Sequence, residues 1–211
     1  MQLSAQSIIV FCNPPKVDPR GVIISPPIKP MISPFSPEKV VVNGRSKGLG
    51  PATYDITIDS DLTLGVNPAL IIQQAILEGW SENNGKALLR NALRANPPMG
   101  AIARSTEKLA MPHFVSAEVM DKSTHARLLV GMFNTYIDPG FEGDLVLELV
   151  NHGAEPLVLK AGDPIAQLKF TLLDQPTDRP YSGKYQGQVG VQGAILEDVS
   201  TAAPSSILRG H

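Results

Sequence analysis

The sequence predicts a mainly β fold, a distorted β barrel or jelly-roll-like sandwich that also contains a few helices. From Gly100 to about residue 173, short apolar segments recur at near-regular spacing, and Gly or Pro separates most of them. This spacing is typical of sandwiches and barrels. A helical pattern is strong only near 68–95. The 211 residues are enough for one domain with its own core.

Two strands are expected before the helices, at 39–44 and 53–58. In the second, the alternation of Tyr54, Ile56 and Ile58 places one face inward. The intervening letters R-S-K-G-L-G-P supply turn chemistry. The prolines from Pro14 to Pro37 predict an extended segment, either an ordered surface loop or an arm across a neighbouring subunit.

Two helices are expected within an insertion that spans about 60–98. The first covers 68–79, with Pro68 in its first turn and Gly79 near its end. The second covers about 86–95, where apolar residues follow helical spacing. The insertion could form a partner surface or a packed helical cap, and we expect the cap.

The second half of the chain predicts a succession of strands followed by a tail. The strands are expected near 100–104, 114–120, 128–133, 144–150, 156–160 and 164–173. The segment from Gln175 onward is rich in Pro, Gly, Ser and Ala, so we expect it to be mobile without a ligand. We therefore expect a single domain over 1–195 and a flexible C-terminal tail over 196–211.

Composition excludes several classes of function. The net charge of -2 gives no electrostatic reason to bind nucleic acid. Cys12 is the single cysteine, so no internal disulfide can form, which fits a reducing cytoplasm. No apolar run has the length of a membrane span, and the first residues make a poor signal peptide. The four His and one Cys lack metal-ligand spacing, so no zinc is expected.

Three short segments carry the chemistry, and they fall in order along the chain. They read D-K-S-T-H-A-R at 121–127, I-D-P-G-F-E-G-D-L-V-L-E at 137–148 and G-K-Y-Q-G-Q-V-G at 183–190. The first offers hydroxyls and cations, the second a turn flanked by carboxylates, and the third a Gly-rich tail with a Lys. Together they could hold a polyphosphate beside one buried acid, which indicates chemistry on a nucleotide.

Glu148 is the candidate acid, within the strand L-V-L-E-L-V. Alternation places Leu145, Leu147 and Leu149 on one face and Glu148 on the other, between two valines. Apolar surroundings disfavour a charged carboxylate and raise its pKa toward a range useful for proton transfer. Taken alone, the residue is more typical of a half-exposed strand whose outer face meets water.

The segment 121–127 offers a second cluster. Ser123 and Arg127 lie four residues apart, so they share a face if this is one helical turn. Lys122, Thr124 and backbone N–H groups could then hold phosphate. The alternative is a surface helix capped by Asp121 or Ser123.

The remaining candidates are weak in isolation. Asp138 opens a tight turn and could be a plain turn residue. Lys184 lies in a tail segment that could close over a phosphate or stay disordered. His125 and His152 have no evident partners in the sequence, and we expect both at the surface.

The order and spacing of these motifs resemble the dCTP deaminase family of the dUTPase-like superfamily. The resemblance rests on I-S-P-F-S-P-E-K-V, G-L-G-P-A-T-Y-D-I, the three segments above, A-G-D-P-I-A-Q-L-K-F and P-Y-S-G-K-Y-Q-G-Q-V-G. It leaves out residues 60–98 and those after about 195. It implies a dUTPase-like β barrel that forms a homotrimer with active sites between subunits. The implied reaction is hydrolytic loss of ammonia from C4 of dCTP, giving dUTP, without a catalytic metal.

The resemblance also implies roles for individual residues. Glu148 matches the catalytic acid and base, and Ser123 and Arg127 match the pair that positions it and the water. The positions that match substrate contacts are Lys122, Thr124, His125, Ala126, Asn134, Thr135, Asp138, Val146, Leu147, Gln167, Tyr181, Lys184 and Gln188. Mg²⁺ would be carried by the triphosphate. Feedback inhibition by dTTP is common in the family.

The sequence departs from the family in places, and other functions stay open. Asp121-Lys122 replaces the usual residues before the Ser, F-N-T-Y-I-D is shorter than the family's stretch, and V-Q-G-A-I replaces a final Ser-Arg. The change at F-N-T-Y-I-D leaves base selectivity open. A dUTP pyrophosphatase or a bifunctional enzyme would use Asp138 as its base. A catalytically silent nucleotide sensor on the same fold is the third alternative.

Overall fold

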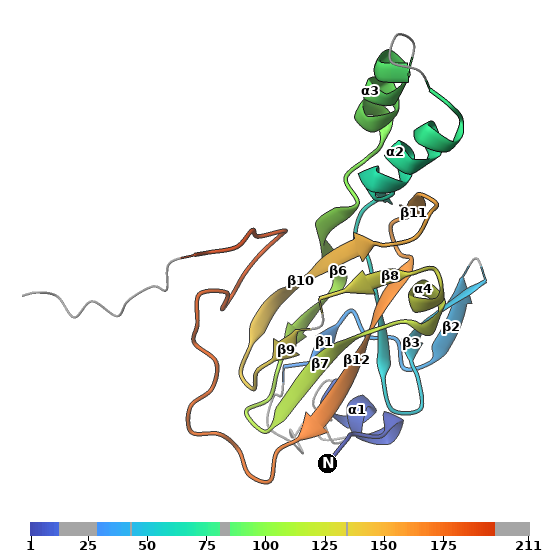
Figure 1. The fold of residues 1–211 in the computed structure, drawn as a ribbon. Helices are drawn as coiled ribbons and strands as arrows, with labels where there is room; N and C mark the ends of the chain where they lie inside the picture. Colours follow the sequence, from blue (N-terminus) through green and yellow to red (C-terminus); the bar gives the residue numbers. More distant parts are fainter. Residues whose placement is uncertain (13–28, 43, 81–84, 134, 197–211) are drawn as a thin grey trace, which may run out of the picture.

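The computed structural model describes residues 1–12, 29–42, 44–80, 85–133 and 135–196. Its described strands pair antiparallel into sheets of six, four and two strands (Figure 1). The mainly β class is therefore confirmed, in the form of separate sheets around one core. The predicted tail over 196–211 lies outside the described residues except for Leu196, as does most of the segment from Pro14 to Pro37.

The six-stranded sheet contains the elements on either side of the first candidate motif. Its order is β2-β3-β4-β12-β7-β9. The strands are β2 (Lys39–Val42), β3 (Arg45–Leu49), β4 (Tyr54–Thr57), β7 (Val115–Asp121), β9 (Tyr136–Ile137) and β12 (Pro164–Leu172). Residues 45–49 were expected to form a turn. They form a strand because they pair with β2 on one side and β4 on the other.

The four-stranded sheet carries the candidate acid. Its order is β1-β6-β10-β8, with β1 (Ile32–Ser33), β6 (Gly100–Ala110), β8 (Val130–Met132) and β10 (Glu142–Asn151). The third sheet pairs β5 (Leu62–Leu64) with β11 (Leu157–Leu159). The sequence did not predict β1, β5 or β9, which are two or three residues long and too short to show a period.

One hydrophobic core joins the two larger sheets. Ile56 and Phe170 enter it from the six-stranded sheet, and Leu147 and Leu149 enter it from β10. Tyr54, Ile56 and Ile58 are buried as predicted, and Asp55 and Thr57 on the other face are buried as well. Tertiary partners explain this burial, since Thr57 bonds Glu107 and Asp55 pairs with Lys122.

The two predicted helices form a hairpin that projects beyond the sheets (Figure 1). They are α2 (Pro68–Leu77) and α3 (Gly85–Ala95). Asn67 caps α2 through its side chain, and Asn96 exchanges two hydrogen bonds with the backbone of Val66 at the base of the hairpin. The expectation of a helical cap was wrong, since the hairpin does not lie over the face of either large sheet.

Two further helices complete the described part of the chain. The sequence did not predict α1 (Ala5–Cys12), which buries Ile8 and Cys12 in the core. The helical turn expected at the first candidate motif is α4 (Ser123–Arg127), which lies between β7 and β8. This placement fixes where Ser123 and Arg127 lie relative to the sheet that carries Glu148.

Candidate functional site

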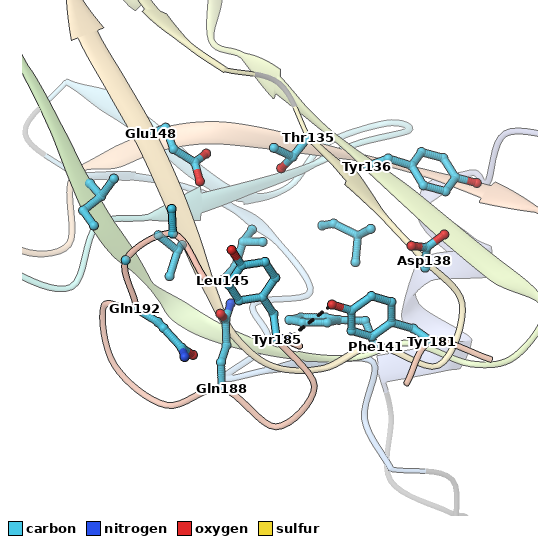
Figure 2. Close-up of a pocket in the computed structure, with 15 residues that line it drawn as sticks. Thr135, Tyr136, Asp138, Phe141, Leu145, Glu148, Tyr181, Tyr185, Gln188 and Gln192 are labelled. Carbon is cyan, nitrogen blue, oxygen red and sulfur yellow. Dashed lines mark hydrogen bonds between the residues drawn. The ribbon is translucent and has the colours of Figure 1, made fainter. Parts of the chain in front are cut away.

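A cavity of about 380 Å³ opens beside β10, and several predicted site residues line it (Figure 2). Its wall is mostly apolar and aromatic, with a few carboxylates, hydroxyls and amides. The lining residues are Ile102, Thr135, Tyr136, Ile137, Asp138, Phe141, Leu145, Val146, Glu148, Tyr181, Tyr185, Gln188, Gln192, Gly193 and Ala194. Such a lining suits a flat, partly apolar ligand that a few polar groups orient.

Glu148 lies in this cavity as the strand alternation predicts. Leu147 and Leu149 on either side are buried in the core, whereas Glu148 is half-buried on the opposite face. It lies opposite Ile102 of β6, so an apolar side chain flanks it across the sheet. Burial raises the pKa of the Glu148 carboxyl above its ordinary value, as expected from the sequence.

An irregularity in β10 helps to shape the cavity floor. The register of β10 against β6 shifts between Asp144 and Val146. A bulge of this kind re-aims side chains, and here the consecutive residues Leu145 and Val146 both line the cavity. The Val146 side chain thus lines the cavity and the Leu147 side chain points into the core, while the predicted contact of their backbone with the base stays a prediction.

The turn after β9 supplies the other carboxylate. Asp138 is exposed at the cavity and opens the predicted D-P-G-F turn, in which the Phe141 N–H donates to the Asp138 carbonyl at 3.2 Å. Thr135 lies on the side of the cavity nearer Glu148 (Figure 2). Asn134, the neighbouring predicted contact, lies outside the described residues.

The tail after β12 folds back and closes one side of the cavity. The Tyr181 N–H donates to the Pro139 carbonyl at 2.8 Å, and the Tyr181 hydroxyl accepts from the Tyr185 N–H at 3.2 Å. The Tyr181 ring packs edge-on against Phe141, with 5.8 Å between centroids. Residues 181–195 therefore bond to the domain and to one another, and the expectation that this tail is mobile without a ligand stays a prediction.

Two glycines allow this close approach. Gly140 and Gly143 both have positive φ values, 86° and 151°. A Cβ at Gly140 would meet Pro180 Cβ at 2.6 Å, and one at Gly143 would meet the Gln188 carbonyl oxygen at 2.9 Å. Any other residue would push the tail away, so the two glycines of P-G-F-E-G are needed for this tail position.

The short helix α4 lies elsewhere, and its predicted catalytic residues do not line the cavity. Ser123 and Arg127 share a face as expected, because the Arg127 guanidinium donates to the Ser123 carbonyl at 3.2 Å. Both are exposed, as are Thr124 and Ala126. The predicted capping was wrong: Lys122 is the N-cap residue, and Asp121 instead accepts from the Met132 N–H of β8 at 2.9 Å.

Lys122 and His125 lie beneath α4 rather than on its surface. The Lys122 ammonium pairs with Asp55 at 2.7 Å, and both side chains are less than 10 % exposed. His125 is buried, so the expectation of a surface histidine was wrong, while His152 is exposed as predicted. Burial lowers the pKa of His125, and the nearby cations Arg45 and Lys122 lower it further.

Two other predicted contacts also lie outside the cavity. Gln167 is half-buried in β12, opposite Asp55 of β4 and Met120 of β7. Lys184 belongs to the folded tail and donates to the Ile195 carbonyl at 2.5 Å. The residues that line the cavity in one chain are thus only part of the predicted set, namely Glu148, Asp138, Thr135, Val146, Tyr181 and Gln188.

Sequence reasoning missed several residues of the cavity wall. Phe141 and Tyr185 lie inside the motifs that were recognised, so their aromatic character next to Gly was the available signal. Ile102 had no such signal, because only the β6–β10 register brings it opposite Glu148. Gln192 lies in the stretch that departs from the family pattern.

The chemistry available to the cavity is proton transfer by a carboxyl group in partly apolar surroundings. Burial raises the pKa of the Glu148 carboxyl above its ordinary value, toward a range in which a carboxyl group can both accept and donate a proton. Across the described residues, no three His, Cys, Asp or Glu side chains gather in a way that could hold a metal ion. No helix of the described part is long and apolar enough to cross a membrane.

Sequence comparisons agree with these features. A family model described as dCTP deaminase-like matches residues 36–173. A dCTP deaminase of the dUMP-forming type from Aquifex aeolicus is 36 % identical over 134 residues, which cover 62 % of this chain and 74 % of the relative. A dCTP deaminase from Campylobacter fetus is 31 % identical over 164 residues, which cover 76 % of this chain and 87 % of the relative.

Solved structures give weaker matches. A dCTP deaminase from Agrobacterium tumefaciens aligns with a TM-score of 0.44 at 17 % identity and covers 81 % of this chain and 47 % of its own. The native dUTPase of EIAV aligns with a TM-score of 0.42 at 17 % identity, covering 65 % and 89 %. The family assignment therefore rests on the sequence matches.

Proposed function

Because the chain belongs to the dCTP deaminase-like family, we propose that it hydrolyses dCTP to dUTP and ammonia. The observation that carries the proposal is the half-buried carboxyl of Glu148, whose pKa burial raises, in a cavity with an apolar and aromatic wall. The curated relatives that match over most of the chain are dCTP deaminases.

In the proposed reaction, Glu148 moves protons between water, the ring and the leaving amine. The carboxylate takes a proton from water, whose oxygen bonds to C4 of the cytosine while N3 is protonated. The tetrahedral intermediate then loses its C4–N bond, the amine leaves as ammonia after gaining a proton, and the carbonyl of uracil forms. Thr135 and Val146 lie beside Glu148, where they could hold the base.

We propose that Ser123 and Arg127 reach the cavity from a neighbouring copy in a homotrimer. They are exposed in one chain and do not line its own cavity. Large apolar side chains are exposed at Leu128 and Leu129, which directly follow α4, and at Phe133 and Tyr136 farther along the chain. Exposed large apolar side chains are what an interface between copies would cover. Thr124, Ala126 and the backbone of Lys122 and His125 would enter the site with the same segment, and the Lys122 ammonium only if its pair with Asp55 opened.

The folded tail and the D-P-G-F turn would complete the nucleotide site. We propose that Asp138 lies on the sugar side, and that Tyr181, Lys184, Gln188 and Gln167 serve the phosphates, with Gln167 and Lys184 lying outside the cavity of one chain. Mg²⁺ prefers phosphate oxygens and water, so it would enter with the triphosphate. A dTTP molecule lacks the 4-amino group, so it would occupy the cavity without turnover and inhibit.

A bifunctional reaction is the second candidate. Asp138 lines the same cavity as Glu148 (Figure 2), and it also borders a neighbouring hollow with Thr177 and Arg179. A carboxylate there could activate water against a phosphate. The relatives from Aquifex aeolicus and Persephonella marina are dUMP-forming.

The test is to incubate the purified protein with dCTP and Mg²⁺, and separately with dUTP, and to separate the products by ion exchange. Conversion of dCTP to dUTP, with dUTP left intact, is the expected result. Formation of dUMP from both substrates would establish the bifunctional enzyme. Hydrolysis of dUTP alone would make the protein a pyrophosphatase, and no turnover at all would favour a nucleotide sensor.

A further inference from the structure

Asp144 is a buried carboxylate at the edge of the cavity, and it does not line the cavity itself. Its side chain is 1 % exposed and pairs with Arg104 at 2.9 Å and with Lys108 at 3.3 Å. Arg104 also pairs with Asp59 at 2.6 Å. Two cations thus face Asp144, and one of them is shared with another carboxylate.

The same carboxylate holds the folded tail. Asp144 Oδ2 accepts from the Gly190 N–H at 2.7 Å. The Asp144 N–H donates to the Gln188 carbonyl at 3.0 Å, and Gln188 Nε2 donates to the Asp144 carbonyl at 2.6 Å. Asp144 therefore makes three hydrogen bonds to residues 188–190. Gln188 lies so close to Gly143 that a side chain at position 143 would collide with it.

The charge of Asp144 makes the bond to the tail strong. Burial alone would raise the pKa of this carboxyl, but the Gly190 N–H, Arg104 and Lys108 together hold the pKa below its ordinary value. Asp144 is therefore ionised at neutral pH, and a hydrogen bond from a backbone N–H to a carboxylate is stronger than one to a neutral oxygen. The tail past Gly190 then places Gln192, Gly193 and Ala194 over the cavity.

We infer that Asp144 is a positioning residue that holds residues 188–194 across the nucleotide cavity through its ion pairs with Arg104 and Lys108. It contacts no group that would react. Its effect passes through the tail, so it sets how tightly the nucleotide is enclosed. The inference rests on the proposed function only in taking the cavity as the nucleotide site, because every hydrogen bond in the argument joins residues of this chain.

Hydrogen–deuterium exchange on the full chain without nucleotide tests directly whether Asp144 holds the tail in place. In Asp144→Asn, we expect peptides within 181–196 to exchange at least about tenfold faster, with the core strands unchanged. The matched control is Asp59→Asn, which removes the other partner of Arg104 but touches no tail residue. Unchanged tail exchange in Asp144→Asn, or equal loosening in Asp59→Asn, would overturn the inference.

A turnover measurement separates positioning from a general structural role. We expect Asp144→Asn to raise the KM for dCTP about tenfold and to change kcat less, since lost enclosure weakens binding first. An unchanged KM for dCTP in Asp144→Asn, or a fall in kcat larger than the rise in KM, would show that Asp144 acts otherwise.

A second variant covers the case in which Asp144→Asn does not fold. Lys108 is 59 % exposed, so Lys108→Met removes a partner of Asp144 without burying a charge. We expect exchange in the same tail peptides to accelerate less than in Asp144→Asn. Unchanged exchange would contradict the role of Asp144 in holding the tail. If the protein proves not to turn over dCTP, the proposed function fails, while the exchange measurements still decide the role of Asp144.

Discussion

Strand β10 and helix α4 carry the predicted catalytic residues, but the two segments place these residues in different surroundings. β10 presents Glu148, half-buried, to a cavity that the same chain encloses with its own tail. α4 presents Ser123 and Arg127 to solvent, away from that cavity. One chain therefore surrounds Glu148 with a cavity but does not bring Ser123 and Arg127 to it. This division is the one expected of a site that lies between two copies.

The two segments also differ in what anchors them. β10 is held by pairing with β6 and β8 and by leucines in the core. The five-residue helix α4 is held from below, by the Lys122–Asp55 pair and by buried His125. Because these buried contacts lie within one chain, α4 can fold before it meets a partner and still present its exposed side chains to that partner.

The largest effect is expected at the acid. Glu148→Gln keeps the size of the side chain but cannot cycle a proton, so deamination should fall roughly 100- to 10,000-fold. Nucleotide binding by calorimetry should stay close to that of the wild type. The matched control is Glu118→Gln, a half-exposed residue on β7 away from the cavity, which should leave turnover unchanged. Strong residual deamination in Glu148→Gln would remove Glu148 from the mechanism.

Mixing two inactive variants tests whether α4 serves a neighbouring copy. Arg127→Ala and Glu148→Gln should each be inactive alone. Co-expressed in equal amounts, they should restore about a quarter of wild-type activity, because random assembly gives that share of sites both native residues. Mixing Glu148→Gln with the double variant should restore none. A mixture as inactive as its components would place both residues in one chain's site.

The buried Lys122–Asp55 pair beneath α4 should contribute more to the free energy of unfolding than a surface ion pair. Lys122→Met leaves Asp55 as an unpaired buried charge, so the free energy of unfolding should fall by about 3–5 kcal/mol in urea denaturation. The control is Lys169→Met, whose pair with Glu118 is 31 % and 44 % exposed and should cost no more than about 1 kcal/mol. Equal losses would show that the buried pair is not the anchor.

The smallest effect concerns pH. The folded state binds the Glu148 proton more tightly than the unfolded state, because burial raises the pKa of this carboxyl above 4.5. The wild type should therefore lose stability relative to Glu148→Gln as pH rises through the raised pKa, and the difference should vanish below the ordinary value. Urea denaturation across this range measures it. A difference that grows toward acid pH would contradict the sign.

The sequence alone predicted the elements whose signal is local. Pro68, Gly79 and the apolar spacing predicted helices at 68–79 and 86–95. The structure confirms both within a few residues. The position of Glu148 on a face apart from the leucines followed from a period of two, and burial raises its pKa as expected. The turn at Asp138 was also correct, because Pro and Gly determine it within four residues.

Only the tertiary structure decided which of these residues meet. β3 looked like a turn because its Gly and Lys weaken a strand signal, and pairing with two neighbours overrides that preference. The burial of Lys122 depends on β4 and its Asp55, about 70 residues earlier in the chain, and buried His125 lies near Arg45 of β3 and Ile165 of β12. Ile102 faces Glu148 only through the β6–β10 register, and Asp144 meets Gly190 only because the tail folds back. Periodicity and turn chemistry act over a few residues, whereas these contacts join segments far apart in the chain, so the packing of the whole domain had to place them.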